Sequence, residues 1–330
     1  MFHKTMIGTA LAVALGTAAP ALAETLKLAH WVPPQHTLTE STVMPLKNGV
    51  EEQTDGALTI DVYPGGELGA GPLEQYVRAV QGVADITWGL PGYTSSQFPK
   101  TMISELPGVK PEGKGGYDVI WDAYEENLKS EFPGTKPLAL WLAEPNVFIM
   151  KDKEIRTPED LKGLKMRVSG SAAAAVIEAL GATPVQMPAG ELYNALQTGL
   201  IDGVVTGSSA IGDFKLNEVA SKYTIGAPLG QISFYLVMNQ AKYDSLPDDQ
   251  KKAIDDNSGR KLSKSAEDGW NAKAKEVIQM LKDNPDKTVI ELSDEEAAAF
   301  GELTEPVTQQ IVDSIDGGQA TLDAMTATSE

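Results

Sequence analysis

The sequence predicts an α/β fold of two lobes, with a long helix spanning both lobes and a ligand cleft between them. At 330 residues the chain exceeds the size at which a single hydrophobic core keeps growing. Short apolar strands alternate with helices along it, which is typical of α/β proteins. The pattern E-x-Y-x5-G-x2-D also occurs twice, at 74–85 and 191–202. Chance or a shared βαβ geometry could produce this match, but it supports two lobes of similar design.

Residues 1–23 have the pattern of an export signal. Lys4 supplies the positive start, residues 7–19 are small and apolar, and residues 21–23 fit the A-x-A cleavage rule. We expect cleavage after Ala23. A membrane anchor would need roughly 20 apolar residues with stop-transfer flanks, and neither is found here. The sequence therefore predicts a periplasmic protein whose mature chain does not insert into a membrane.

The charge balance limits the possible partners. A formal net charge of −19 argues against nucleic acid and against anionic membrane surfaces. An acidic coat that keeps an exported protein soluble explains the charge equally well. In both cases an anionic ligand must be captured by a local positive site. Because the chain has no cysteine, it has no disulfide, thiol nucleophile or thiolate metal site.

The first part of the chain reads as alternating strands and helices. A strand at 26–29 runs into H-W-V-P-P at 30–34, where two prolines make a rigid loop that directs Trp31 beyond the C-terminal end of the strand. Ligands of open α/β sheets bind at that end. The elements that follow are a helix to 55, a strand at 58–62, a helix from 72, a strand at 83–88 and an irregular loop at 89–94.

The alternation continues to the end of the chain. Residues 247–284 look almost continuously helical, with Gly259 and Gly269 as weak points. A helix of that length would span roughly 57 Å and cross both lobes. The polar stretch from 317 is expected to be loosely held. The other elements are strands at 138–142, 147–150, 201–205, 232–238 and 288–292, and helices at 171–180, 191–197, 294–300 and 304–315.

The stretch at 157–170 is the leading candidate for a ligand site. Thr157 is a good N-cap before a proline at the first helical position, and Gly163 ends the short turn. In the strand that follows, Arg167 has the opposite parity to the apolar residues and lies near the C-terminal end. Its planar guanidinium can donate two parallel hydrogen bonds to a carboxylate. A surface arginine is the alternative, because other basic residues lie nearby, namely Arg156, Lys162 and Lys165.

Further candidates follow the ends of predicted strands. Thr206, Ser208 and Ser209 come after the strand at 201–205, where their hydroxyls can receive a polar ligand. Aromatic side chains at or near strand ends can wall the cleft, although core packing explains any single one of them equally well. These are Trp31, Trp88, Tyr93, Phe148 and Phe234.

The common catalytic and cofactor signatures are not found. The chain has no G-x-S-x-G, Walker A or H-E-x-x-H motif. His30 and His36, the histidines outside the signal, have no carboxylate cluster beside them and are better explained as loop residues than as metal ligands. We therefore expect no cofactor and no metal. A periplasmic enzyme such as a hydrolase is the alternative, and it would have to work with Ser, Tyr, Asp and Glu alone.

Motifs in a specific order and spacing run through nearly all of the mature chain. They are Y-P-G-G-E-L-G at 63–69, D-L-K-G-L-K-M-R-V at 160–168, E-L-Y-N-A-L-Q-T-G-L-I-D-G at 191–203 and F-Y-L-V-M-N at 234–239. On these motifs the chain resembles the extracytoplasmic solute-binding subunits of TRAP transporters, the DctP type.

The resemblance implies a fold, a partner and a role for one residue. The fold is the periplasmic binding protein fold of two α/β lobes, hinge strands and a long helix spanning both. We expect lobe I at 24–144 with 233–272, and lobe II at 145–232 with 273–330. By the L-K-x-R motif, Arg167 would bind the ligand carboxylate, and the closed protein would deliver its ligand to membrane permease subunits.

Departures from the family pattern bear on the ligand. Sialic-acid-binding members have a second arginine where this chain has Asn146, Val147 and Phe148, an asparagine in place of Thr206 and an acidic residue near Leu90. We therefore expect Asn146 and Phe148, with Thr206, to contact the ligand of this chain. The resemblance therefore disfavours a sialic acid and a dicarboxylate that needs two cations. It favours a monocarboxylate with an apolar or aromatic part, such as a 2-oxo or 2-hydroxy acid. A non-carboxylate solute and a sensing or structural role remain as alternatives.

Overall fold

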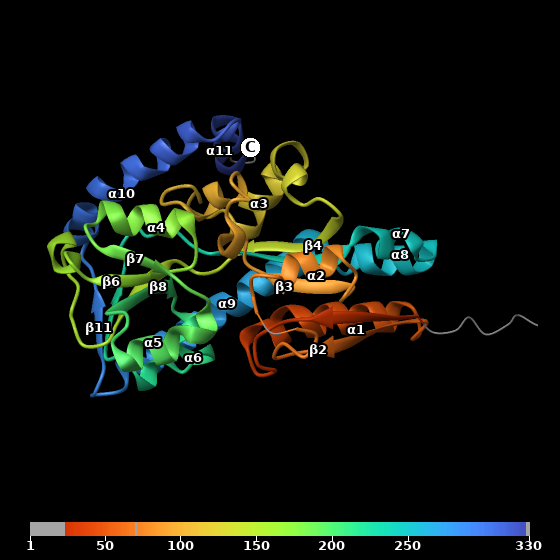
Figure 1. Cartoon of the computed structure of the whole chain (residues 1–330), viewed down its shortest axis with the longest axis horizontal. Helices are drawn as coiled ribbons and strands as arrows, with labels where there is room; N and C mark the ends of the chain where they lie inside the picture. Colours follow the sequence, from red (N-terminus) through yellow and green to blue (C-terminus); the bar gives the residue numbers. More distant parts are fainter. Residues whose placement is uncertain (1–23, 70, 328–330) are drawn as a thin grey trace, which may run out of the picture.

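The computed structural model describes residues 24–69 and 71–327, so the predicted export signal lies outside the described residues. Figure 1 shows two lobes, each built around its own β-sheet, with the helix α9 (Gly259–Lys282) running between them. This arrangement confirms the predicted α/β fold of two lobes. Within the described part of the chain, no helix is both long and apolar enough to cross a membrane.

The first lobe contains a five-stranded sheet in the order β2-β1-β3-β10-β4. β1 pairs in parallel with β2 and β3, whereas β10 runs antiparallel to β3 and β4. The chain thus returns to the first sheet after building the second. The strands are β1 (Glu24–Ala29), β2 (Leu58–Tyr63), β3 (Ile86–Gly89), β4 (Thr135–Leu142) and β10 (Ser233–Asn239).

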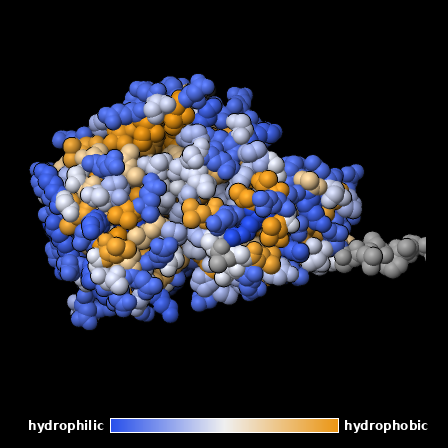
Figure 2. Space-filling view, in the orientation of Figure 1, coloured by the Kyte–Doolittle hydropathy of each residue, from blue (hydrophilic) through white to orange (hydrophobic). Residues whose placement is uncertain are grey.

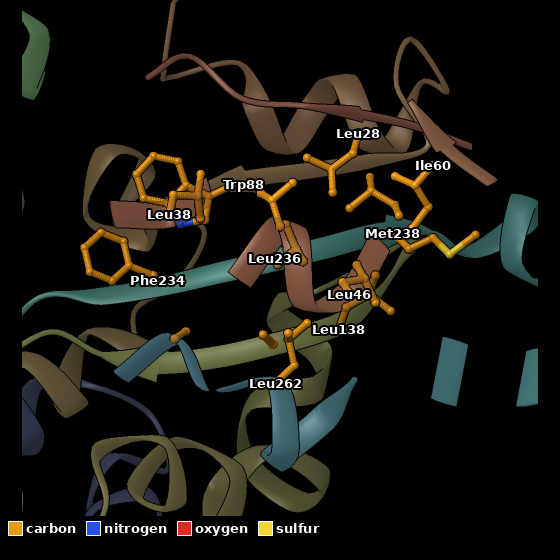
Figure 3. Close-up of a cluster of buried hydrophobic side chains, with 14 of the residues drawn as sticks. Leu28, Leu38, Leu46, Ile60, Trp88, Leu138, Phe234, Leu236, Met238 and Leu262 are labelled. Carbon is orange, nitrogen blue, oxygen red and sulfur yellow. The ribbon is translucent and has the colours of Figure 1, made fainter. Parts of the chain in front are cut away.

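Successive side chains of β10 point to opposite faces of this sheet and so enter two different cores. Leu236 and Met238 pack in a cluster that includes Leu46 of α1 (Met44–Gln53) and Leu262 of α9 (Figure 3). Tyr235 and Val237 pack in the cluster on the other face. Helices therefore cover both faces of the sheet, as expected for a strand that is buried almost throughout.

The second lobe contains a six-stranded sheet in the order β11-β9-β5-β8-β6-β7. β6 pairs in parallel with β7 and β8, and β5 is antiparallel to β8 and β9. Parallel pairing puts the C-terminal ends of β6 and β8 at the same edge of the sheet. The strands are β5 (Asn146–Met150), β6 (Lys165–Val168), β7 (Thr183–Gln186), β8 (Gly203–Gly207), β9 (Lys222–Ile225) and β11 (Thr288–Glu291).

The aspartate that ends the repeated sequence pattern has the same structural role in both lobes. The Oδ2 atoms of Asp85 and Asp202 each accept a hydrogen bond of 2.7 Å from a backbone N–H, of Lys27 on β1 and Lys165 on β6 respectively. The backbone N–H of each aspartate donates to the carbonyl of the same lysine at 2.9 Å. Each aspartate therefore joins the start of one parallel strand to its neighbour, which explains its fixed spacing from the glycine stop.

The long helix is shorter than the sequence predicts. The chain forms α8 (Asp248–Asp256) and then breaks before α9, because Gly259 has a φ of +66° that does not fit a continuous α-helix. α9 has 24 residues, about 36 Å at the helical rise. It packs against β4 and α3 (Gly116–Ala123) of the first lobe and against α6 (Ser209–Asp213) and β11 of the second.

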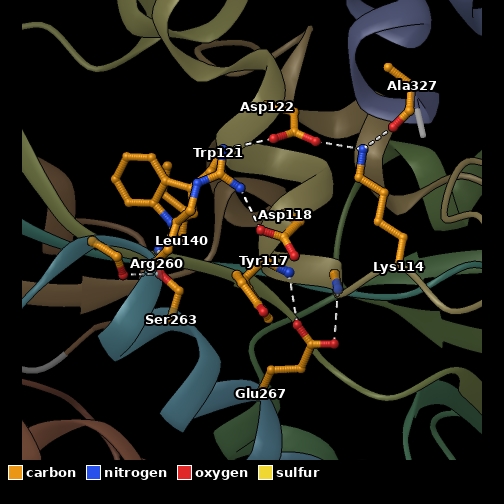
Figure 4. A network of polar contacts seen from close by, with 12 residues as sticks. Lys114, Tyr117, Asp118, Trp121, Asp122, Leu140, Arg260, Ser263, Glu267 and Ala327 are labelled. Carbon is orange, nitrogen blue, oxygen red and sulfur yellow. Dashed lines mark hydrogen bonds and ion pairs between the residues drawn. The ribbon is translucent and has the colours of Figure 1, made fainter. Parts of the chain in front are cut away.

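Polar contacts fix α9 to α3 (Figure 4). The Glu267 carboxylate accepts backbone hydrogen bonds from Gly116 at 2.9 Å and Tyr117 at 2.8 Å. The Ser263 hydroxyl accepts from the Trp121 indole N–H at 2.8 Å and from the backbone of Leu140 at 2.9 Å. These contacts make the first half of α9 an integral part of the first lobe.

The C-terminal region also differs from the prediction. Residues 294–300 and 304–315 form one helix, α10 (Asp294–Ser314), which starts at a Ser293–Glu296 capping box. The stretch from 317, expected to be loosely held, forms α11 (Gly318–Thr326), in which Thr321 and Met325 are fully buried. α11 packs against α3 of the first lobe, whereas the sequence assigned this stretch to the second.

Shorter helices cover the remaining faces of both sheets, and the face shown in Figure 2 is mainly hydrophilic. In the first lobe these are α2 (Gln75–Val80) and α7 (Gln240–Ser245), with π-helical turns at Thr39–Val43 and Tyr124–Leu128 and 3-10 turns at Pro91–Thr94, Thr101–Glu105 and Lys129–Glu131. In the second they are α4 (Ser171–Ala179) and α5 (Leu192–Thr198), with 3-10 turns at Pro158–Leu161, Ala189–Glu191 and Leu216–Glu218.

Candidate ligand-binding site

A cavity of about 40 Å³ lies between the two lobes. Both lobes contribute, so the site exists only while the lobes are together. The wall is formed by Trp31, His36, Trp88, Leu90, Tyr93, Ala143, Ile232, Phe234 and Trp270 and by Arg167, Ala189, Thr206, Gly207, Ser209, Ala210, Asp213 and Phe214.

Arg167 is held at the C-terminal end of β6 by the structure the sequence predicts. Thr157 and Asp160 form a capping box at the start of the preceding 3-10 turn, and Gly163 leaves that turn with a φ of +76°. The Arg167 side chain is 1% exposed, and its Nε donates to the Met187 carbonyl at 2.9 Å. The hydrogen bond at Nε thus fixes the guanidinium in the cavity wall, while Nη2 lies beside the Tyr93 hydroxyl.

The buried charge of Arg167 has no acidic partner nearby. Among the described residues, no carboxylate oxygen lies within 4.0 Å of its guanidinium. Burial lowers the pKa of Arg167 from its ordinary value, but a guanidinium remains protonated in proteins. A buried, uncompensated cation is costly, and a ligand carboxylate would compensate it.

Tyr93 connects the two lobes beside Arg167. It lies in the 3-10 turn Pro91–Thr94 of the first lobe, and its hydroxyl accepts a hydrogen bond of 2.9 Å from the backbone of Ala189 in the second. The same hydroxyl lies 3.5 Å from Nη2 of Arg167. Burial raises the pKa of Tyr93, so it stays neutral. A neutral hydroxyl leaves the arginine charge available to a ligand.

Stacked aromatic rings make the wall apolar. Trp88 stacks on Trp31 and on Phe234, each with ring centroids 5.5 Å apart, and Trp31 stacks on Phe214 at 6.1 Å. Trp270 of α9 packs against Phe234 at 5.3 Å. The buried indole nitrogens of Trp31 and Trp88 have no hydrogen-bond partner among the described residues. The rings therefore cover one another's faces in a continuous apolar stack, which lines the cavity with aromatic carbon.

A carboxylate lies in another part of the wall. Asp213, at the end of α6, accepts hydrogen bonds at Oδ1 from the backbone N–H of Thr37 at 3.2 Å and from its hydroxyl at 3.1 Å. Its Oδ2 lies 3.5 Å from Nε2 of His36. Burial lowers the pKa of His36 to about 3 and raises that of Asp213 to about 6. At neutral pH this is therefore a polar contact of a neutral histidine, and not an ion pair.

Three of the residues predicted from the sequence lie away from this cavity. Phe148 is fully buried in the core of the second lobe, where it packs against Phe300 of α10 at 5.8 Å. Asn146 and Ser208 line a separate groove beside α9. The predicted residues that the structure brings together in the cavity wall are Trp31, Trp88, Tyr93, Arg167, Thr206 and Phe234, together with Ser209.

Several wall residues could not be found from the sequence. Asp213 ends a five-residue helix too short for a periodic signal, and Phe214 follows it as the C-cap. Trp270 lies on α9, far along the chain. His36 was noted only as a loop residue, and its buried contact with Asp213 depends on tertiary packing. Within the described part of the chain, no cluster of three or more His, Cys, Asp or Glu residues could hold a metal ion.

Comparison with known protein families identifies the family to which this chain belongs. The family model of the bacterial extracellular solute-binding proteins, family 7 (DctP), matches residues 28–314. The chain belongs to this family. It is a TRAP extracytoplasmic solute-binding protein, and members of the family are periplasmic transport proteins. A curated relative, the C4-dicarboxylate-binding periplasmic protein DctP of Rhodobacter capsulatus, is 29% identical over all of both chains.

Solved structures of TRAP solute-binding proteins share the fold of this one. A TRAP solute-binding protein from Rhodoferax ferrireducens, in complex with copurified benzoate, is 30% identical with a TM-score of 0.84, over 92% of this chain and 96% of that one. A marine metagenome TRAP protein specific for aromatic acid ligands, in complex with 3-hydroxybenzoate, is 28% identical with a TM-score of 0.84, over 92% and 97%.

Proposed function

We propose that this TRAP solute-binding protein captures a small aromatic monocarboxylate in the periplasm and delivers it to membrane permease subunits. The observation that carries the proposal is Arg167, a buried cation in the cavity wall with no carboxylate partner among the described residues. A ligand carboxylate there would receive the charge-assisted hydrogen bonds that a guanidinium donates. Export through cleavage after Ala23 is part of the same proposal.

The rest of the wall supports an aromatic ligand. Trp31, Trp88 and Phe234 present stacked rings to the cavity, and aromatic pairs of this kind favour offset stacking with a further ring. The benzoate and 3-hydroxybenzoate complexes of the two solved relatives agree with this ligand class.

The contacts of His36 favour binding over hydrolysis. A serine hydrolase needs a histidine nitrogen free to take the proton of its nucleophile. Nδ1 of His36 accepts a hydrogen bond from the Leu38 backbone at 3.1 Å, and Nε2 faces Asp213. Neither nitrogen is left for a nucleophile such as Ser209. With its pKa lowered to about 3, this histidine is also a poor base.

A thermal-shift screen of the mature protein tests the proposal. A ligand that binds the native state raises the apparent melting temperature by mass action. Benzoate and mandelate should each raise it, and benzamide, which has the shape of benzoate without its charge, should not. Succinate serves as the dicarboxylate control. A shift with benzamide or a neutral sugar, without one for any monocarboxylate, would overturn the proposal.

A further inference from the structure

Asp213 occupies a distinctive position in the cavity wall. Among the described lining residues it is the only carboxylate, and Arg167 is the only arginine or lysine. The two side chains do not form an ion pair, since their charged atoms are more than 4.0 Å apart. Asp213 and His36 also line a surface groove outside the cavity, together with residues of α9. They therefore separate the cavity from solvent on that side.

Hydrogen bonds hold Asp213 in place and oppose the rise in its pKa, to about 6, that burial causes, so the carboxylate is charged at neutral pH. The two hydrogen bonds donated by Thr37 reach Oδ1 from the first lobe. Because Nδ1 of His36 accepts a hydrogen bond, the proton of the neutral ring is on Nε2, facing Oδ2 of Asp213. The side chain is only 4% exposed. Asp213 therefore presents a fixed negative charge when the lobes are together.

A fixed negative charge in the cavity wall changes the relative affinities of ligands with one and with two carboxylates. A carboxylate bound at Arg167 is attracted to that end of the ligand, whereas a second carboxylate on the same small ligand would share the cavity with the negative charge of Asp213. Like charges in a partly desolvated site repel strongly, and placing one against an unwanted ligand is an effective way to exclude it. A hydroxyl group at the same place would instead donate a hydrogen bond to the carboxylate.

We propose that Asp213 is a specificity-determining residue, which rejects ligands with a second carboxylate and thereby restricts the site to monocarboxylates. The inference rests on the proposed function, because it assumes that one carboxylate is bound at Arg167. The inference gives a reason why the proposed site accepts an aromatic monocarboxylate and rejects a dicarboxylate of similar shape.

The test compares wild-type protein with Asp213→Asn by calorimetry, using benzoate and the three benzenedicarboxylates. Asparagine has nearly the same size, and its oxygen can still accept the hydrogen bonds from Thr37. Its amide nitrogen then faces the Nε2–H of His36, a change that acts on all ligands, so the charge is reported by the ratio of dicarboxylate to benzoate affinity and not by either affinity alone. We expect at least one dicarboxylate to gain roughly 10- to 100-fold in affinity relative to benzoate. The control Thr37→Val removes the hydroxyl that donates to Asp213 and keeps both the backbone donor and the charge, so all ligands should weaken by a similar factor.

The outcomes separate the inference from the proposed function. If wild-type protein binds benzoate but Asp213→Asn leaves every ratio of benzoate to dicarboxylate affinity unchanged, Asp213 does not set specificity and the proposed function stands. If wild-type protein binds no carboxylate, the proposed function and the inference about Asp213 are both wrong.

Should Asp213→Asn not fold, the same ratio is measured in wild-type protein at pH 8 and pH 5.5. Protonation of Asp213 at the lower pH should favour the dicarboxylates, and an unchanged ratio would overturn the inference. The charged or titratable groups around Asp213 are His36, Lys273, Glu276 and Glu144. Because burial raises the pKa of Glu144 to about 7, the measurement is repeated in Glu144→Gln.

Discussion

The hydroxyl of Tyr93 lies 3.5 Å from Nη2 of Arg167, although the two residues belong to different lobes. The same oxygen accepts a hydrogen bond from Ala189, which follows the Met187 carbonyl that fixes Nε of Arg167. One tyrosine of the first lobe thus contacts both the cation of the second lobe and the segment that positions it. If Arg167 receives the ligand carboxylate, as we propose, separating the lobes would therefore also take apart the site around it.

Tyr93→Phe should weaken ligand binding by about 0.5–1.5 kcal/mol, the usual value of one hydrogen bond. The ring remains in the wall, so the loss reflects the missing contact between lobes. Calorimetry with benzoate measures it. In the control Tyr223→Phe, the lost hydrogen bond, to the Ala220 carbonyl, lies within the second lobe. Equal affinities of wild type and Tyr93→Phe would show that this contact does not support closure.

Glu267→Ala should destabilise the protein by about 1–2 kcal/mol, because the backbone N–H groups of Gly116 and Tyr117 at the start of α3 lose their acceptor. Glu267→Gln keeps one acceptor oxygen, so its stability should lie between that of wild type and that of Glu267→Ala. Denaturant unfolding measures both variants. A loss in Glu267→Ala no larger than that in Glu267→Gln would contradict the capping role of the carboxylate.

Glu105→Gln should change how stability depends on pH. Oε1 of Glu105 accepts hydrogen bonds from the backbone and hydroxyl of Ser233, and burial raises the pKa of the carboxyl from 4.5 to about 7. The folded state therefore holds this proton more tightly than the unfolded state, so its contribution is complete below about pH 4.5 and is lost as the pH rises through 7.

We accordingly expect wild-type protein to lose more stability than Glu105→Gln between pH 5 and pH 8. Each kcal/mol corresponds to about 2–4 °C in melting temperature for domains of 150–250 residues. At pH 5 the two proteins should melt at similar temperatures. Parallel pH profiles for the two would mean that the buried carboxyl does not titrate in this range.

The sequence predicted Arg167 well because local rules determine its position. The capping box at Thr157 and the positive φ of Gly163 start the strand, and strand parity places the arginine opposite the apolar residues. Phe148 shows a strand in which the alternation of side chains does not identify the cavity-facing residues. All five residues of β5 are buried, so helices cover both of its faces and alternation cannot tell a cavity wall from a core.

The remaining wall residues depend on contacts between distant segments. Trp270 and Asp213 reach the cavity only because α9 and α6 pack beside the first lobe, and no local pattern encodes that packing. The break before α9 was signalled by Gly259, but a glycine alone does not say whether a helix bends or stops. The internal repeat, in contrast, predicted two equivalent strand connections that the structure shows at Asp85 and Asp202.

Calorimetric titration of benzoate into wild-type protein and Arg167→Ala tests the central claim most directly. Removing one partner of a buried charge pair should cost about 2–5 kcal/mol, roughly 30- to 5000-fold in affinity. The affinities of the two proteins for uncharged benzamide should differ far less than those for benzoate. Circular dichroism should confirm that the variant is folded. A folded Arg167→Ala protein that binds benzoate within a few-fold of wild type would contradict the assignment of Arg167 as the carboxylate receptor.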